Sequence, residues 1–298
     1  MRNLLLLSGL IGLALLLLLV VLGPALTPHD PLARAQLLPV NGATAMPPHP
    51  PHAEHPLGTD QRGRDILSGL LAGGRYTLLF TMGAVGLCLL VGVPLGLLAG
   101  WRGGWAGAAL QSLAAGVSAV PPLLLTGLLL NWMQIAASGG PPLLQSVRNG
   151  LVLALIAAPR IADQVRRLTV QVRAMPYIEA AVAAGATGQR IAFRHVLPNL
   201  LGPLTTTALM EAAGVLRTLA LLSLFGIYIV PVTVVDMGGG RVVNTPAMPE
   251  WTSYLGDFYS TMRLSYWVML YPGIAIAVAM LVFHLTAEGL RRRWQRAG

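Results

Sequence analysis

The feature that most constrains this chain is its series of long apolar segments. The first, Leu4–Leu22, contains no charged side chain. Four further segments are mostly apolar over a similar length: residues 77–99, 107–130, 200–222 and 266–286. A helix that crosses a bilayer needs about 20 predominantly apolar residues. The sequence therefore predicts an integral membrane protein rather than a soluble domain.

A sixth segment, residues 147–168, is less apolar because it contains Arg160 and Asp163. Charged residues inside a span usually face protein or water rather than lipid, so we count it as a span. Six spans place both termini on one side of the membrane. By this topology that side carries twelve arginines and the opposite side seven. Because positive residues concentrate on the cytoplasmic side, we expect both termini to be cytoplasmic.

Composition excludes several classes of function. Charged residues make up 10% of the chain, against about 25% in an average soluble protein. All twenty cationic residues are arginine, so the chain lacks the lysine of a nucleotide-binding P-loop and of Schiff-base chemistry. Cys88 is the only cysteine, which excludes an intrachain disulfide and a multi-cysteine metal site. We interpret Cys88 as a packed residue of a membrane helix.

The segment at 23–76 has two parts of different character. Its first half is rich in proline, and we expect an extended, polyproline II conformation there. Its second half, residues 55–65, reads His-Pro-Leu-Gly-Thr-Asp-Gln-Arg-Gly-Arg-Asp. Glycines allow tight turns and the charged side chains can bond locally. We therefore predict an ordered turn.

Three histidines in this segment, His49, His52 and His55, follow one another at intervals of three residues. Polyproline II has three residues per turn and a rise of about 3.1 Å per residue, so the three rings share an edge but lie about 9 Å apart. Zinc ligands lie only about 2 Å from the ion. We interpret these histidines as part of a solvated linker and assign no metal site, although a folded turn would bring them closer.

The loop at 169–198 contains signals for two short helices. Pro176 suits the first turn of a helix, and Gly185 suits its end. Residues 189–196 can form a second short helix that ends before Pro198. We predict a hinge at residues 185–188 between the two helices, in a loop suited to docking against another protein.

Two patterns resemble a known family. The first resembles the EAA loop of permease subunits in ABC importers, and its residues are Glu179, Ala180, Ala181, Gly185, Ile191, His195, Pro198 and Asn199. The second resembles the signature of the dipeptide/oligopeptide/nickel permease family, specifically its second permease subunit, and its residues are Gly58, Thr59, Asp60, Gly63, Arg64 and Asp65. The resemblance runs from residue 55 onward in the family's order. An apparent insertion at 228–246 departs from it.

The resemblance implies an all-α integral membrane protein with about six transmembrane helices and a cytoplasmic EAA-type coupling loop, the type I ABC importer permease fold. The implied divisions are an anchor helix at 1–22, an extracytoplasmic segment at 23–76, a permease core at 77–287 and a basic cytoplasmic tail at 288–298. Within the core, the coupling loop is 169–198 and the outer loop is 223–265.

The resemblance also implies function. This chain would form the translocation path with a second permease, in the inner membrane of a prokaryote. Two separate ATPase subunits would bind at the cytoplasmic face, and an extracytoplasmic solute-binding protein would deliver peptides, nickel chelates or oligosaccharides. ATP and Mg²⁺ would bind to the partner ATPases, so we assign no cofactor, no catalytic residue and no nucleic-acid partner to this chain.

Charged residues within the spans are candidates for the path. Arg160 and Asp163 are three residues apart, a spacing at which helical side chains can pair. Glu211 and Arg217 are six residues apart, or about 120° around a helix. They are therefore poor mutual partners, and we expect each to face another chain or a water-filled cavity. Both are candidate path residues.

Two other classes of protein stay open. A secondary transporter or channel without an ATPase would carry ionisable residues in several spans and repeated halves. An intramembrane enzyme would need paired aspartates or a Ser/His set inside the spans. His284 stands alone in the last span, where we interpret it as a packed, hydrogen-bonded residue.

Overall fold

The structure is a computed structural model that describes residues 4–33, 38–40, 43–136, 141–230, 232–236, 242–246, 248–256 and 265–297. Its long helices are α1 (Leu4–Leu22), α2 (Ile66–Arg102), α3 (Gly104–Ala119), α4 (Pro122–Ala136), α5 (Pro142–Arg173), α8 (Leu197–Leu224) and α10 (Trp267–Ala297). The shorter elements are η1 (Gly23–Ala25), β1 (Leu38–Val40), β2 (Ala43–Ala45), α6 (Pro176–Ala183), α7 (Gly188–Ile191), the π-helical turn η2 (Ala192–Val196), β3 (Val232–Asp236), β4 (Val242–Pro246) and η3 (Thr252–Leu255).

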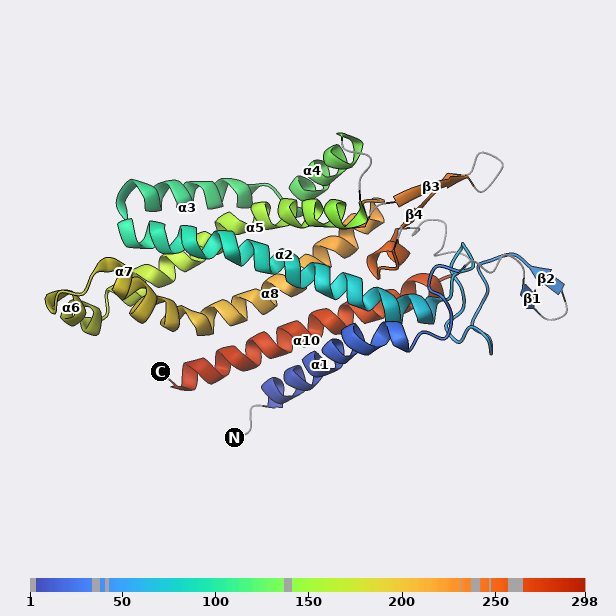
Figure 1. Cartoon of the computed structure of the whole chain (residues 1–298), viewed down its shortest axis with the longest axis horizontal. Helices are drawn as coiled ribbons and strands as arrows, with labels where there is room; N and C mark the ends of the chain where they lie inside the picture. The colour runs from blue at the N-terminus through green and yellow to red at the C-terminus, as the bar shows by residue number, and fades with distance from the viewer. Residues whose placement is uncertain are drawn as a thin grey trace.

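Apart from α4, the long helices run roughly along the molecule's longest axis (Figure 1). Both hairpins, β1–β2 and β3–β4, lie at one end, which we call the hairpin end. The short helices α6 and α7 lie at the opposite end together with both chain termini, and we call this the α6 end. Both termini therefore lie on the same side, as an even number of spans requires.

Within the described part of the chain, four helical segments are long and apolar enough to cross a membrane: Leu4–Ala25, Ile66–Arg102, Arg194–Leu224 and Trp267–Gln295. A fifth span results if the bent pair of α3 and α4 is counted as one. Helix α5 is also long enough, but charged residues along it, including Arg160 and Asp163, interrupt its apolar character. The predicted sixth span is therefore present as a helix without being apolar enough to count on composition.

The predicted span at 107–130 is not one straight helix. It divides into α3 and α4, which are bent by 83° at the break. Val120 has an extended backbone, with φ −90° and ψ 130°. A residue before proline is pushed out of the helical region by the proline ring, and Pro121 follows Val120 directly. The Pro121-Pro122 pair therefore breaks the helix.

Several helices extend beyond the predicted spans. Helix α2 begins at Ile66, before residue 77, because the Asp65 side chain caps its first turn. Helix α5 continues to Arg173, past the predicted loop start at 169. Helix α10 continues into the predicted tail as far as Ala297, and Glu288 there pairs with two arginines on its own helix. Residues 38–40 and 43–45 form the hairpin β1–β2 rather than the predicted polyproline II conformation.

The insertion predicted at 228–246 contains the hairpin β3–β4, whose register pairs Val232 with Pro246. The three glycines Gly238–Gly240, which come between the two strands in the sequence, lie outside the described residues. The membrane part is all-helical as predicted, and the two hairpins are additions to it at the hairpin end.

Helices α2 and α5 form the most extensive helix pair of the described chain. Three glycines of α2 at intervals of four residues face α5. A Cβ atom added to each would lie 2.9 Å from Ile161 Cγ2 at Gly92, 2.6 Å from Val165 Cβ at Gly96, and 2.7 Å from Thr169 Cβ at Gly100. Only glycine permits this approach, which is the small-residue packing typical of membrane helices. We call these three residues the glycine seam.

Helices α1 and α10 lie side by side (Figure 1) and pack through small residues as well. A Cβ atom on Gly9 would lie 2.5 Å from Thr286 Oγ1, and one on Gly289 would lie 2.5 Å from the Leu6 Cα. The segment predicted as an anchor helix is therefore packed against the last helix of the chain.

The glycine seam yields a prediction. Gly96→Ala places a methyl group against the Ala162 carbonyl and Val165, so we expect it to destabilise the fold by about 1–3 kcal/mol, as overpacking does. Gly86→Ala is the matched control, because the Cβ of Gly86 on the same helix meets nothing within 4 Å. Alanine there should be neutral or stabilising by about 0.5–1 kcal/mol. Thermal unfolding of the three proteins in one detergent checks this, and equal melting temperatures would contradict it.

Candidate translocation path and coupling loop

A polar cavity of about 320 Å³ lies among α3, α4, α5 and α8. It contains charged groups in the middle of the membrane helices, where such groups usually serve function. Its lining residues are Val117, Ser118, Pro122, Thr126, Leu153, Ile156, Ala157, Arg160, Glu211, Gly214, Val215, Arg217 and Thr218. The predicted path residues Glu211 and Arg217 thus line the same cavity.

An ion pair between Arg160 of α5 and Glu211 of α8 lies in this cavity. The Glu211 side chain is 9% exposed, whereas that of Arg160 is 58% exposed. One helical turn nearer the α6 end, Gln164 Nε2 donates to Thr207 Oγ1 at 2.7 Å. The contact between α5 and α8 is therefore polar, with the cavity at its side.

The expected pairing of Arg160 with Asp163 is wrong. Asp163 accepts from Arg166 Nε at 2.9 Å and also pairs with Arg167, both on its own helix. Asp163 thereby neutralises arginines nearer the α6 end, and Arg160 is left to reach across to Glu211. Spacing along the sequence did not distinguish these two arrangements. Asp163 has arginines both before it, at Arg160, and after it, at Arg166 and Arg167, and the actual partner of Arg160 lies on a different helix.

Arg217 has no ion-pair partner among the described residues. Its side chain is exposed and it does not pair with Glu211, as the angle between them on the helix predicted. Of the two surroundings expected for Glu211, another chain or a cavity, the structure has the cavity, and Arg160 of the same chain is its partner. His284 donates from Nδ1 to the Met280 carbonyl at 2.9 Å, as predicted, but its side chain is exposed rather than packed.

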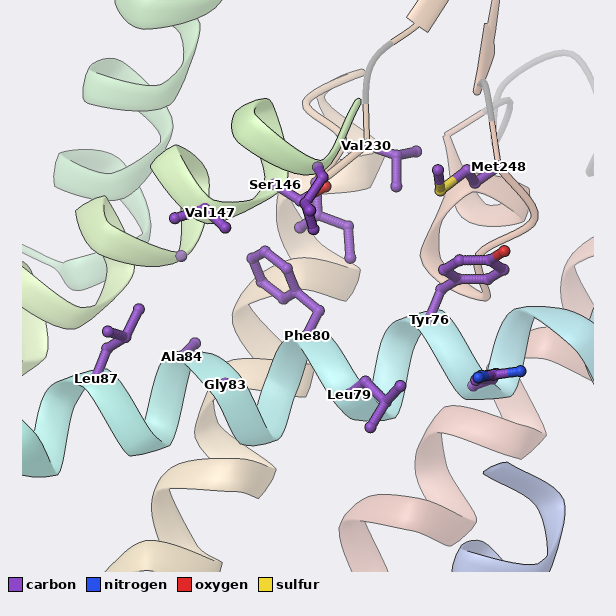
Figure 2. A pocket seen from close by; sticks show the side chains of 14 residues that line it. Tyr76, Leu79, Phe80, Gly83, Ala84, Leu87, Ser146, Val147, Val230 and Met248 are labelled. Atoms are coloured by element: carbon purple, nitrogen blue, oxygen red, sulfur yellow. The ribbon is translucent and has the colours of Figure 1, made fainter. Parts of the chain in front are cut away.

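A second, larger cavity of about 550 Å³ lies nearer the hairpin end, between α2 and α5, and sequence analysis did not find it. Tyr76 and Phe80 extend from α2 toward Val230 and Met248 (Figure 2). Of its lining residues only Arg75, Tyr76 and Ser146 have polar side chains. Its lining comes from α2, α5 and a loop far apart in the sequence, so no local pattern indicated it.

The predicted coupling helix is present as α6, with Pro176 in its first turn. Gly185 ends it with φ +77°, a left-handed conformation that favours glycine. The Ala186 amide donates to the Ala181 carbonyl at 3.0 Å, and the Gly185 amide donates to the Val182 carbonyl at 2.9 Å. These two bonds complete the predicted helix end.

One buried side chain anchors α6, and most of the helix is exposed. Ile178 is 3% exposed and belongs to a buried cluster that includes residues of α5. The Tyr177 hydroxyl also accepts a hydrogen bond from Asn199 Nδ2 at 3.2 Å. In contrast, Val182 is 56% exposed, and Glu179 and Ala180 are exposed too. The Glu179 carboxylate has no hydrogen bond or ion pair among the described residues. The exposed face of α6 is thus small, partly apolar and carries one negative charge.

The second predicted helix does not end before Pro198. Helix α7 passes through the π-helical turn η2 directly into α8, which begins at Leu197. Proline cannot donate the usual helical hydrogen bond, and the wider π turn just before it accommodates that loss. Ile191 is buried with Ile178, and Asn199 Nδ2 donates to the His195 carbonyl at 2.6 Å. The predicted loop residues therefore lie together at the root of α8.

The loop is also attached to the end of α2. Arg173 Nη1 donates to the carbonyls of Gly100 at 3.0 Å and Trp101 at 2.5 Å, and its guanidinium lies 4.8 Å from the Trp101 ring centroid. A Cβ atom on Gly188 would lie 3.1 Å from Trp101. Arg173 and Trp101 therefore fix the loop to the α2–α5 pair, although neither was identified from the sequence.

The turn at 55–65 is ordered, as predicted. Asp60 accepts the amides of Arg62 at 2.8 Å and Arg64 at 2.9 Å, and pairs with the Arg64 guanidinium at 2.7 Å. Gly58 and Gly63 have φ of +78° and +76°. Asp65 accepts the Ser68 amide at 2.8 Å and so begins α2. The backbone of Thr59 pairs with that of Asp65, which closes the turn.

This turn binds the segment before α10. The Arg64 guanidinium lies 5.8 Å from the ring centroid of Tyr254. Burial raises the pKa of the Tyr254 hydroxyl to about 12. Trp251 donates from its backbone to Thr77 Oγ1 at 3.1 Å and from Nε1 to the Leu70 carbonyl at 2.8 Å. The hairpin end is therefore held together by hydrogen bonds between segments distant in sequence.

Glu250 lies fully buried beside Trp251, in a loop outside the spanning helices. A Cβ atom on Gly73 would lie 3.3 Å from the Glu250 Cα, so α2 covers it closely. Burial raises the pKa of Glu250 to about 8, and the Thr252 side chain opposes part of that shift. The carboxyl group is therefore mainly protonated in the folded chain at neutral pH.

This gives a pH prediction. Between the ordinary pKa of 4.5 and the folded value of about 8, the folded chain holds a proton that the unfolded chain has lost. The contribution of Glu250 to stability is therefore complete below about pH 4.5 and is lost as the pH rises to about 8. The melting temperature of the wild type should fall over this range more steeply than that of Glu250→Gln, which keeps a neutral side chain. Identical pH profiles would contradict the assignment.

Comparison with known proteins agrees with this architecture. Residues 92–296 match the family described as binding-protein-dependent transport system inner membrane component. The chain therefore belongs to this family of membrane permeases. It is a permease subunit of an ABC importer, and the family resemblance seen in its loops is confirmed.

Individual relatives are similar over most of the chain. The dipeptide transport system permease protein DppC of Alkalihalophilus pseudofirmus is 30% identical over 291 residues, covering 97% of this chain and 85% of that protein. The di/tripeptide transport system permease protein DppC of Pseudomonas aeruginosa is 29% identical over 288 residues, covering 96% and 86%. The glutathione transport system permease protein GsiD of Pectobacterium atrosepticum is 31% identical over 241 residues, covering 81% and 72%.

Proposed function

We propose that this chain forms one half of the membrane path of an ATP-driven importer for short peptides, and that a second permease forms the other half. Relatives named for dipeptides, di/tripeptides and glutathione support peptides over nickel chelates or oligosaccharides. An extracytoplasmic solute-binding protein would deliver the peptide at the hairpin end.

The polar cavity is the best candidate for the path within this chain. A short peptide carries a positive amino group and a negative carboxylate at pH 7, and both are costly to place in a membrane. Arg160 and Glu211 offer the two complementary charges in one cavity, and Arg217 adds a second cation at its wall. Between transport events Arg160 and Glu211 neutralise each other.

We infer that α6 docks on one of two separate ATPase subunits, which bind ATP and Mg²⁺. The α6 end is then cytoplasmic, in the inner membrane of a prokaryote, and both termini lie on that side. The excess of arginine on this side supports the orientation. Small residues and the exposed Val182 give α6 a surface that another protein can approach closely.

The observation that carries the proposal is the direct structural link between α6 and the cavity. Ile178 of α6 packs on α5, the helix that carries Arg160. Arg173 ties the end of α5 to the end of α2. A displacement of α6 by an ATPase would therefore be transmitted to the wall of the cavity, which is the two-state coupling that alternating access requires.

A charge exchange tests the path. The single variants Arg160→Glu and Glu211→Arg should each lower the melting temperature, because each breaks the ion pair. The double variant restores an ion pair, so its melting temperature should be close to that of the wild type. Dipeptide uptake by the complete importer in proteoliposomes should stay at least about tenfold lower, the effect of about 1.4 kcal/mol of lost interaction, because the charges that meet the peptide have exchanged places. Recovery of both stability and uptake would show that the pair is only structural.

A matched pair of glycine variants tests the coupling. Gly185 at the α6 end and Gly226 at the end of α8 both have positive φ, and the Cβ of each would meet nothing within 4 Å. Each ends its helix with the same pair of backbone hydrogen bonds, and asparagine tolerates a left-handed conformation better than most residues, so Gly185→Asn and Gly226→Asn should carry similar strain. Only Gly185→Asn should lower ATP-driven uptake, by about tenfold, since overpacking a docked surface costs about 1–3 kcal/mol. Equal uptake by the two variants in the assembled importer would contradict docking at α6.

A further inference from the structure

A group of metal-binding side chains lies at the hairpin end. His29, His55 and Asp65 each offer one ligand atom, and these atoms all lie within 4.8 Å of one another. His55 Nδ1 is 2.9 Å from Asp65 Oδ1, and His29 Nδ1 is 3.8 Å from Asp65 Oδ2. The two imidazole rings are tilted toward each other, with centroids 4.7 Å apart. Of the histidines considered from their spacing, only His55 belongs to this group.

We propose that His29, His55 and Asp65 form a binding site for a divalent ion of the zinc class. Two imidazole nitrogens and one carboxylate oxygen are typical zinc ligands, and three protein ligands leave a fourth position for water. Ligand atoms around a tetrahedral zinc ion lie about 3.4 Å apart, given bond lengths of about 2.0–2.2 Å. The three ligand atoms lie within 4.8 Å of one another, so side-chain rotations that draw them together by about 1.4 Å would complete the site.

Backbone hydrogen bonds hold the three ligands in place. The His29 amide donates to Ser68 Oγ at 3.1 Å, which ties the segment after α1 to the first turn of α2. The Ser68 amide donates to Asp65 Oδ2 at 2.8 Å, an outer bond of the kind that orients metal-binding carboxylates. The His55 carbonyl accepts the amides of His52 at 3.0 Å and Gly58 at 2.8 Å. The site is therefore built by the folded chain.

The exposure of the ligands suits an ion that enters from one side. The side chains of Asp65 and His55 are 1% and 8% exposed, whereas that of His29 is 41% exposed. Asp65 and His55 are therefore the buried ligands of the site, and His29 is the ligand nearest to solvent. Binding requires a free electron pair on Nδ1 of both rings, so the proton of each neutral imidazole lies on Nε2 when the ion is bound.

The alternative is that the bond between His55 and Asp65 only stabilises the turn at 55–65. This reading needs no His29, because the turn and the cap of α2 are complete without it. A substitution at His29 therefore distinguishes the two explanations. Because the His29 side chain is partly exposed, this substitution should leave the fold intact. An occupied site would connect the segment after α1 to the start of α2, at the end where substrate enters.

The test uses the full-length chain in detergent, purified with a tag that contains no histidine and stripped of metal with EDTA. Zinc is titrated by calorimetry and counted by elemental analysis. We expect one Zn²⁺ per wild-type chain. His29→Gln should weaken the affinity by at least about tenfold, since the loss of even an outer-shell partner has that effect. His52→Gln is the matched control, because the Nδ1 of this neighbouring histidine is engaged by the Pro50 carbonyl at 2.9 Å.

The outcomes separate clearly. Loss of affinity in His29→Gln alone, with unchanged circular dichroism and melting temperature in the absence of zinc, supports the site. A wild-type chain that binds no zinc, or a His29→Gln variant that binds as tightly as the wild type, overturns it. Equal weakening by His52→Gln also overturns it, because zinc would then be held by a general cluster of histidines.

Discussion

Close packing of α2 on α5 through the glycine seam is the constraint on which the rest of the structure depends. Helices in lipid gain little from the hydrophobic effect, so they associate through close van der Waals contact and hydrogen bonds. Helix α5 needs this support more than the others, because Arg160, Asp163 and other charged residues make it a poor membrane span on its own. The seam covers one face of α5 with α2, and Arg160 of α5 reaches Glu211 of α8 in the polar cavity.

The two ends of this helix pair differ in a way that suits coupling. At the hairpin end, the turn centred on Asp60 and the buried Trp251 join distant segments through many hydrogen bonds. At the α6 end, the loop is attached mainly through Ile178 and Arg173, and Gly185 leaves its outer surface open. In the proposed mechanism a partner reaches the exposed face of α6, and the α2–α5 pair would carry its displacement to Arg160.

Local patterns in the sequence were sufficient where the structure itself is local. The turn at 55–65 and the end of α6 at Gly185 were predicted because their hydrogen bonds join neighbouring residues. The span containing Pro121 was predicted as straight, since hydropathy alone does not register a backbone break. The Arg160–Glu211 pair, the apolar cavity and the proximity of His29 to Asp65 depend on helix packing. No spacing rule along one segment indicates which distant residue will lie opposite.

We propose that this chain works as one of two permeases driven by separate ATPases. The proposal is tested by tagging the chain in its native membrane, solubilising it gently and identifying the proteins that copurify. We expect two ATPase subunits and a second permease of similar size. Recovery of the chain alone or as a homo-oligomer, under conditions that keep a control importer intact, would contradict it.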